Sequence, residues 1–430
     1  MKALVDLRPL RENRTFRRLW IGSTASGFGG QFGAFASVYY LWDTTHSAAV
    51  VGLLGLAIAA PLIVLSLVGS AFIDHVDRRR LALRCTGGQI LVSAATTAVV
   101  FTGAGGVPAV LGLAAAGSAL GALGGPARRA FIPALLAGDR LAPGLALNHL
   151  SFQLAMLLGP AAAGALTAVA GVGWCFAFDT LTFGAALIGL AGLPSGVAAA
   201  EGRAGLRAVR AGLAYAARTP EVRGALLADL AATLFAMPIA LFPVVNAELF
   251  GGRPEILGLF TTALAAGGVT ASVLSGLATR RPRPGRLMLA CGAVWALALG
   301  TLGLVTVGPA WPGAVGMAGT LGVVLLLIAV AGAADTWAVV ARGTVVQSTT
   351  PNAYLGRVSA LEAIAGQAGP QLGNLRAGLV ASATSGGAAL AIGGATALAA
   401  TALIAVSTPA LRRFTVPTEG ALTGSYLHGY

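Results

Sequence analysis

The sequence predicts an all-α membrane protein of about twelve transmembrane helices in two six-helix bundles, with both termini in the cytoplasm. Three observations carry this prediction: long apolar segments recur along the chain, arginines gather in alternate connectors, and one polar stretch divides the chain near its middle. Of the 430 residues, 56% are hydrophobic and only 10% are charged. Because a soluble domain carries about 25% charged residues, a chain this apolar lacks the polar surface that water requires.

The apolar segments set the positions of the predicted helices, since a span needs about 20 apolar residues. The predicted spans of the first half are 19–41, 48–73, 82–104, 107–127, 145–170 and 174–193. Those of the second half are 224–247, 255–278, 287–308, 313–340, 358–382 and 386–408. We therefore expect an N-terminal bundle at 1–193, a linker at 194–223, a C-terminal bundle at 224–410 and a cytoplasmic tail at 411–430.

The arginines predict the orientation of these spans. Most of the 28 Lys and Arg residues fall in the connectors that are cytoplasmic when the N-terminus is placed inside. Arg342 and Arg357 are expected to flank one such connector, and only Arg253 and Arg376 fall elsewhere. This asymmetry is typical of the positive-inside rule. Because the basic residues, which give a net charge of +13, lie in short connectors and not on a soluble face, nucleic-acid binding is not expected.

The linker contains a predicted amphipathic helix at 205–217. Leu206 and Leu213 share one side of this helix, whereas Arg207 and Arg210 lie on another. We expect the helix to lie along the membrane surface with its arginines toward anionic lipid headgroups.

The clearest motif follows the second span, where residues 69–80 read Gly-Ser-Ala-Phe-Ile-Asp-His-Val-Asp-Arg-Arg-Arg. This segment resembles the loop of the major facilitator superfamily that latches the two bundles together on the cytoplasmic side. It departs from that loop at His75, where arginine is usual, and at Asp77, where glycine is usual. The alternative is an ordinary basic loop that ends a helix. The resemblance implies a gating latch formed by Gly69, Asp74, Asp77, Arg78, Arg79 and Arg128.

A second motif lies in the fifth span and consists of Gly159, Pro160 and Gly164. It resembles the Gly-Pro signature of major facilitator antiporters, with Ala155 and Ala163 at positions where glycines are often found. Proline removes one intrahelical hydrogen bond, and the small residues permit close packing and a bend. The alternative is a proline kink in a span rich in glycine and alanine.

Two further segments, 125–133 and 347–358, resemble the superfamily branch that holds the bacterial enterobactin exporters and the macrolide efflux proteins. The resemblance covers residues from about 14 to 410. It implies a major facilitator fold in the bacterial inner membrane, acting as a monomer among membrane lipids. The implied activity is proton-coupled export of a catecholate siderophore or a similar amphiphilic small molecule by alternating access. Multidrug or macrolide efflux is the alternative.

Ionisable side chains within spans are costly and therefore indicate function. They include Asp179 in the sixth span and the proton-coupling candidates Asp229, Asp335 and Glu362. A structural role is the alternative, because Glu362 suits a helix N-terminus and Asp335 has Arg342 as a possible partner. In the first span, Gln31 stands where some relatives carry an acid, which weakens a proton site in the N-terminal half.

Two stripes at helical spacing are the candidates for substrate contact. One is aromatic, with an amide beside it, in the first span, and the other is amide-rich, followed by an arginine, in the eleventh. The residues are Phe28, Gln31, Phe32, Phe35, Tyr39, Gln367, Gln371, Asn374 and Arg376. Together they would suit a bulky, partly aromatic molecule that forms hydrogen bonds. The alternative for the aromatic stripe is lipid contact, whereas unsatisfied amides are disfavoured in hydrocarbon.

No enzymatic chemistry is expected of this chain. The three cysteines, Cys85, Cys175 and Cys291, fit neither a disulfide framework nor a metal site, and the four histidines do not cluster. A P-loop and a cofactor motif are both missing from the sequence, as is the cluster of His, Asp and Glu that a membrane-embedded enzyme needs. We therefore expect no metal, no cofactor and no catalytic residue.

Overall fold

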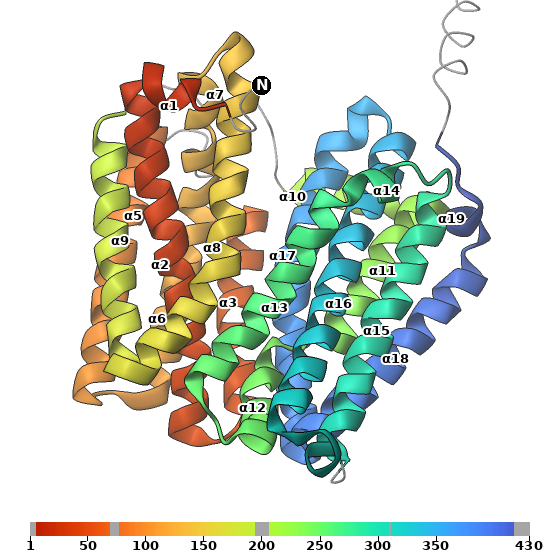
Figure 1. Cartoon of the computed structure of the whole chain (residues 1–430). Coiled ribbons are helices and arrows are strands. Elements are labelled where there is room, and N and C mark those ends of the chain that lie inside the picture. The colour runs from red at the N-terminus through yellow and green to blue at the C-terminus, as the bar shows by residue number, and fades with distance from the viewer. Residues whose placement is uncertain (1–5, 69–76, 194–205, 309–310, 417–430) are drawn as a thin grey trace, which may run out of the picture.

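A computed structural model describes residues 6–68, 77–193, 206–308 and 311–416, and Figure 1 shows the whole chain. The described residues form helices and connectors, with no strand among them. The first helices are α1 (Arg8–Glu12), α2 (Arg14–Thr45), α3 (Ala48–Val68), α5 (Arg78–Thr102), α6 (Gly106–Arg129), α7 (Phe131–Leu135), η1 (Gly138–Arg140), α8 (Leu141–Ala170) and α9 (Gly173–Ala191). We call these helices the N-terminal bundle.

The linker helix α10 (Leu206–Arg218) precedes the helices that we call the C-terminal bundle. These are α11 (Pro220–Ala236), η2 (Ile239–Leu241), α12 (Phe242–Phe250), α13 (Pro254–Val273), α14 (Ser275–Thr279), α15 (Pro284–Val307), α16 (Trp311–Thr349), α17 (Asn352–Ala383), α18 (Gly386–Ser407) and α19 (Pro409–Arg413). In Figure 1 the two bundles lie side by side, and α1 and α19 lie at the same end of the molecule. We call this end the terminal side and the opposite end the far side.

Local sequence signals explain where several helices begin and end. The side chain of Asn13 accepts a hydrogen bond from the Phe16 N–H at 2.8 Å and caps the start of α2. Gly103 ends α5 with a positive φ of 70°, a conformation that glycine adopts without steric cost. These caps supply partners for backbone groups that the ends of a helix leave free.

Ten helical segments of the described chain are long and apolar enough to cross a membrane. The prediction of an all-α, multi-pass membrane protein is therefore confirmed. The two long helices outside this group are α2 and α17, each of 32 residues, which correspond to the predicted first and eleventh spans. Each carries one of the two stripes noted above, the aromatic one in α2 and the amide-rich one in α17, and both helices pack against several others.

The predicted seventh span, 224–247, is not one continuous helix. Helix α11 ends at Ala236, the short η2 follows Pro238, and α12 begins at Phe242. Proline lacks the N–H of a regular helix, so two prolines within six residues, Pro238 and Pro243, favour a break. The side-chain oxygen of Asn374 accepts a hydrogen bond from the Ala240 N–H at 3.1 Å. The Ala240 N–H, which the break leaves outside a regular helix, therefore still has a hydrogen-bond acceptor in a region without water.

The two bundles meet mainly where α3 packs on α17 and α8 packs on α13. Glycines make both contacts close. A Cβ added at Gly52 would lie only 2.9 Å from the Asn374 carbonyl oxygen, and one added at Gly258 would lie 3.2 Å from the Ala161 Cα. These residues lie near the starts of α3 and α13 and late in α17 and α8, so the bundles touch toward the far side.

Buried apolar side chains from both bundles extend this contact and form one hydrophobic cluster. It includes Phe32 and Phe35 of α2 together with Leu241 and Phe242 at the break between α11 and α12. In a lipid environment such packing, and not the hydrophobic effect, holds helices together.

Glycine contacts inside the C-terminal bundle give a test of the fold. A Cβ added at Gly394 of α18 would lie 2.6 Å from the Ala296 carbonyl oxygen and 2.6 Å from the Gly300 Cα of α15. We expect Gly394→Ala to lower the thermal unfolding temperature of the detergent-purified protein, because overpacking costs about 1–3 kcal/mol. Tryptophan fluorescence during heating measures the unfolding temperature.

The matched control is Gly322→Ala in α16, where an added Cβ would meet nothing within 4 Å. Alanine favours helix over glycine by about 0.5–1 kcal/mol, so this variant should keep or raise the unfolding temperature. Equal effects of the two substitutions would contradict the close approach of α15 and α18.

Candidate functional site

A chamber of about 970 Å³ lies between the two bundles. Its walls come from α2, α3, α5, α6, α8 and α9 on one side and from η2, α12, α13, α16 and α17 on the other. Small-molecule sites commonly measure about 300–1,000 Å³, so the chamber has room for a large organic ligand.

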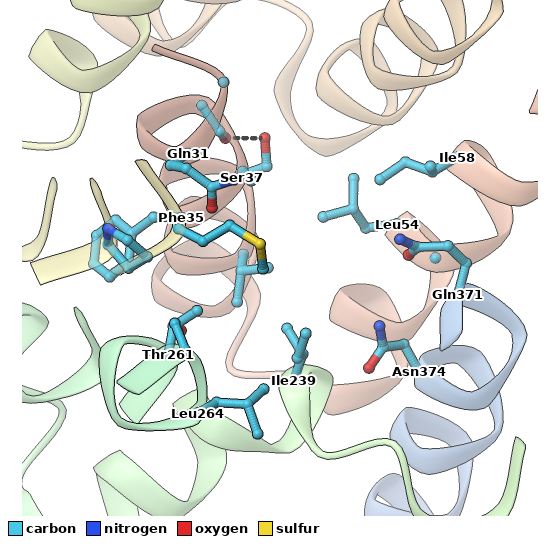
Figure 2. Close-up of a pocket in the computed structure, with 18 of the residues that line it drawn as sticks. Gln31, Phe35, Ser37, Leu54, Ile58, Ile239, Thr261, Leu264, Gln371 and Asn374 are labelled. Carbon is cyan, nitrogen blue, oxygen red and sulfur yellow. Dashed lines mark hydrogen bonds between the residues drawn. The ribbon is translucent and has the colours of Figure 1, made fainter. Parts of the chain in front are cut away.

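Amides from opposite bundles face this chamber, as Figure 2 shows. Gln31 and Phe35 project from α2, and Gln371 and Asn374 project from α17. The structure thus brings together part of each predicted stripe, because α2 and α17 occupy opposite walls. Asn374 also accepts the hydrogen bond from Ala240, so its orientation is held by the backbone of η2.

The remaining substrate-contact candidates lie outside the chamber lining. The Phe32 ring lies 4.6 Å from that of Phe178, and the Tyr39 ring stacks on Phe35. Arg376 donates a hydrogen bond to the Phe235 carbonyl oxygen and lies over the Phe235 ring. These three side chains pack against neighbours at positions that the chamber does not reach.

Phe28 and Gln367 also lie outside the lining of the chamber. Phe28 is half-buried on α2. Gln367 lines a smaller hollow of about 330 Å³ with Arg342 and Glu362.

The proton-coupling candidates lie around Arg342 in the C-terminal bundle. Arg342 forms an ion pair with Asp229 of α11, and its Nε lies 3.5 Å from Glu362 Oε1 of α17. Asp335, two turns before Arg342 on α16, lines the chamber. We call Asp229, Arg342, Glu362 and Asp335 the charge cluster.

Two details of the charge cluster differ from expectation. The sequence predicts Arg342 beside a connector, but α16 continues to Thr349, so this arginine lies inside the helix with 9% of its surface exposed. Its ion pairs join it to Asp229 and Glu362, not to Asp335. The length of α16 decides where Arg342 lies, and the rotation of the helix decides which acids it pairs with. Neither property follows from the apolar pattern alone.

The charge cluster contains more acid than base. If all three carboxylates were ionised, one guanidinium would leave a net charge of about −2 within the span region. Uncompensated buried charge is costly, so this arrangement favours at least one carboxyl group that holds a proton. One oxygen of Asp229 has no hydrogen-bond partner among the described residues.

The predicted latch is described only in part, because Gly69 and Asp74 lie outside the described residues. Asp77 caps α5 by accepting a hydrogen bond from the Arg80 N–H at 2.9 Å. Arg79 donates to the Ala191 carbonyl oxygen at the end of α9, at 2.7 Å.

The other two described latch residues are Arg78 and Arg128. Arg78 is the first residue of α5 and is half-buried. Arg128, late in α6, donates to the Gln89 side-chain oxygen at 3.3 Å. The described latch residues therefore join helices of the N-terminal bundle to one another at the terminal side.

The Gly-Pro motif of α8 lies at the contact between the bundles. A Cβ added at Gly159 would lie 2.5 Å from the Gln31 Cβ, and one added at Gly164 would lie 2.5 Å from the Pro254 carbonyl oxygen. The Pro160 carbonyl oxygen contacts Gly258, and Pro160 also lines the chamber. The motif thus adjoins both the chamber wall and α13.

The linker helix α10 packs on the C-terminal bundle through one of its faces. Gly212 and Ala216 are buried, whereas Leu213 is exposed. A Cβ added at Gly212 would lie 2.8 Å from the Arg357 carbonyl oxygen. The Tyr215 hydroxyl donates to the Thr349 carbonyl oxygen at 2.9 Å. The Tyr215 ring also stacks on Tyr354 of α17, so the face that meets α17 combines two small residues, Gly212 and Ala216, with this tyrosine, whereas Leu213 is exposed.

The structure also places Asp179 in the chamber wall. The only sequence signal for this position is the acid itself within an apolar span. In the described part of the chain, no group of three or more His, Cys, Asp or Glu residues is arranged to hold a metal ion.

Comparisons with known proteins agree with this architecture. A family model described as a transmembrane secretion effector matches residues 5–418. The enterobactin exporter EntS of Citrobacter koseri is 24% identical over 420 residues, which cover 96% of each chain. EntS of Shigella boydii serotype 18 is 27% identical over 364 residues, which cover 83% of each chain.

Solved structures share the fold at low identity. The nucleoside transporter NupG superposes with a TM-score of 0.69 at 12% identity over 93% of this chain and 100% of its own. A bacterial homologue of the iron transporter ferroportin, in an inward-facing state, superposes with a TM-score of 0.70 at 16% identity over 93% and 99%.

The family match covers nearly the whole chain, and the relatives are exporters aligned over most of their length. Their chemistry is transport, not catalysis. The chain therefore belongs to the transmembrane secretion effector family of the major facilitator superfamily, and it is a multi-pass membrane transporter, not an enzyme.

Proposed function

We propose that this protein is a proton-coupled secondary exporter of a catecholate siderophore, or a similar amphiphilic small molecule, in the bacterial inner membrane. The observation that carries the proposal is a chamber of about 970 Å³ between two bundles that touch mainly toward the far side. The relatives named enterobactin exporters support the substrate class.

The proposed topology has twelve spans, with both termini in the cytoplasm. Its support is the arginine pattern of the sequence together with the position of α1 and α19 at one end of the molecule (Figure 1). The far side then faces outward. With the bundles in contact there through α3 and α17 and through α8 and α13, the chamber would receive its substrate from the cytoplasm.

Alternating access would follow from rocking of the two bundles about these contacts. At Gly52, Gly258 and Gly378 the backbones of the two bundles meet directly, so at these points the bundles would separate without repacking long side chains. The segment 69–80 is proposed to hold the terminal side closed in the opposite state. Asp77, Arg78 and Arg79 would contribute from the start of α5, and Arg128 from α6.

The proposed site of proton coupling is the charge cluster. Asp229, which forms an ion pair with Arg342 and keeps one oxygen without a hydrogen-bond partner among the described residues, is the foremost carrier, and Asp335 and Glu362 adjoin it. Asp335 also lines the chamber, so a substrate there lies close to the acids whose protonation would change. A proton that enters from the outside would release the substrate in exchange.

The chamber lining suits the proposed substrate. Aromatic rings and aliphatic side chains make up most of it, and Gln31, Gln371 and Asn374 add hydrogen-bonding groups. A catecholate has flat aromatic rings and hydroxyl groups, which such a wall binds through apolar contact and a few directed hydrogen bonds.

Transport in inverted membrane vesicles tests the proposal. With an imposed inside-acid pH gradient, vesicles that contain the wild-type protein should accumulate iron-free enterobactin. Asp229→Asn should reduce this accumulation at least about 10-fold, because an amide cannot exchange a proton at this site. Radiolabelled substrate retained on filters measures uptake.

The control is Asp139→Asn, which removes a carboxylate whose side chain is 72% exposed and pairs with Arg8 at the surface. Its transport should equal that of the wild type, since exposed ion pairs contribute little. If the vesicles accumulate a macrolide and not the siderophore, the protein is a drug-efflux transporter. If the pH gradient does not change accumulation of either compound, proton coupling is rejected.

The charge cluster also predicts a stability pattern. Arg342→Gln should lower the unfolding temperature strongly, because it leaves Asp229 buried without its cation, a change that typically costs about 3–5 kcal/mol. Adding Asp229→Asn to that variant should restore much of the lost stability but not the gradient-driven transport. Heating curves and vesicle uptake on the two single variants and the double variant measure the two effects.

Additive losses of stability in the double variant would mean that the two side chains do not form a pair. Full recovery of transport in it would show that neither residue takes part in coupling.

A further inference from the structure

Asp179 is a buried carboxylate in the wall of the chamber, and the charge cluster does not include it. It lies in α9 with 8% of its surface exposed, and it lines the chamber from the N-terminal bundle. Its Oδ2 accepts a hydrogen bond from the Ser93 hydroxyl at 2.8 Å. Its Oδ1 has no hydrogen-bond partner among the described residues. Buried polar atoms are almost always satisfied, so an unpartnered carboxylate oxygen in a cavity wall requires an explanation.

The helix beside Asp179 accommodates the carboxylate at two glycines. Helix α2 packs closely on α9 and presents glycines at the position of the carboxylate. A Cβ added at Gly29 would lie 3.0 Å from Oδ1, and one added at Gly33 would lie 3.2 Å from Oδ2. No side chain of these two residues therefore covers the carboxylate or donates to it.

Hydroxyl groups of α5 and α9 fix the other side of the carboxylate. Thr180 lies with its Oγ1 3.0 Å from Ser93 Oγ and donates to it, and Ser93 donates in turn to Asp179. Such a chain strengthens each of its hydrogen bonds and holds the acceptor in one orientation. The carboxylate is thereby held in one orientation, with Oδ2 beside Ser93 and Gly33 of the chamber lining, which is the arrangement of a binding group and not of a mobile surface acid.

The charges around the chamber indicate which ligand group Asp179 would receive. Among the described lining residues the ionisable side chains are Asp179, Asp335 and His149, with no lysine or arginine. Arg128 reaches the wall only through Gln89, whose side-chain oxygen accepts its hydrogen bond. Within the described chain Asp179 forms no ion pair, in contrast to Asp229, which has Arg342. A wall with acids and no cation disfavours anions and favours groups that donate hydrogen bonds.

We propose that Asp179, oriented by Ser93 and bordered by Gly29 and Gly33, is the substrate-binding carboxylate of the N-terminal bundle and accepts a hydrogen bond from a donor group of the substrate. The donor is a neutral hydroxyl or a cationic amine, and anionic ligands are excluded. This inference rests on the proposed function for the identity of the chamber as the transport site. It adds a binding residue that is not part of the charge cluster. It also adds a selection rule, namely that the chamber accepts ligands with hydrogen-bond donors and excludes anionic ligands.

The selection rule has a direct consequence for a siderophore. In the iron-free form the catechol hydroxyls are donors and carry no charge near neutral pH. In the ferric complex the same oxygens have lost their protons to the metal, so the donors are gone and the complex is anionic. The chamber should therefore bind the iron-free form and reject the ferric form, without any contact that senses iron itself.

Equilibrium binding to the purified full-length protein in detergent, without any gradient, tests the inference. The probes are iron-free enterobactin, its ferric complex and ethidium, an aromatic cation with amino donors. We expect iron-free enterobactin, ethidium or both to bind the wild type, and the ferric complex to bind at least about 10-fold more weakly. Asp179→Asn should weaken binding of the donor ligands by about 10-fold or more, since hydrogen bonds to charged groups are among the strong ones.

Two controls separate binding from folding. Asp43→Asn, an exposed acid on α2 outside the lining, should leave all three affinities unchanged. The unfolding temperature of Asp179→Asn should equal or exceed that of the wild type, because the substitution removes a buried charge that has no cationic partner in the described chain. A carboxylate with a merely structural role would instead lose stability when neutralised.

The outcomes distinguish this inference from the proposed function. Loss of donor-ligand binding in Asp179→Asn, together with absent gradient-driven transport in the wild type, would support the binding role and reject proton coupling. Binding of ethidium alone through Asp179 would support the role and move the substrate to cationic drugs. Unchanged affinities in Asp179→Asn, equal binding of the ferric complex, or no binding of any probe to the wild type would overturn the inference.

Discussion

Helix backbones approach one another closely at glycines, and the chamber and its sites follow from that packing. In lipid no hydrophobic force draws helices together, so packing must come from contact at short range. Gly52 and Gly258 let α3 meet α17 and α8 meet α13, and these two contacts join the bundles. The chamber exists because the contacts lie toward the far side and leave the space between the bundles open beside them.

Buried charge is the second organising feature, and the two bundles differ in the groups that compensate their buried acids. In the C-terminal bundle Arg342 compensates Asp229 and adjoins Glu362, which leaves the cluster partly neutralised. In the N-terminal bundle Asp179 has Ser93 as its donor and, among the described residues, a second oxygen without a partner. We infer that the C-terminal bundle couples protons and that the N-terminal bundle contributes a binding group for the substrate.

Much of the fold and part of the site could be predicted from the sequence. The apolar segments and the arginine pattern predict the helices and their order, and the Gly-Pro motif predicts a packed region of α8. Gln31, Phe35, Gln371 and Asn374 are predicted to contact substrate, and they line the chamber. Phe32, Tyr39 and Arg376 carry the same periodic signal yet pack elsewhere, because a stripe at helical spacing does not reveal which neighbour it faces.

That this chain is a helical membrane protein of the major facilitator type follows from the sequence alone, because hydropathy, charge asymmetry and local motifs are properties of contiguous residues. Three features required the packed structure: Arg342 lies within α16 and pairs with Asp229, the helix after Ala236 breaks into η2, and Asp179 lines the chamber. These features depend on how far each helix extends and how it is rotated against its neighbours. Contacts between residues far apart in the sequence set that rotation, such as Ala240 with Asn374, 134 positions apart, and Ser93 with Asp179, 86 positions apart, and no local pattern contains it.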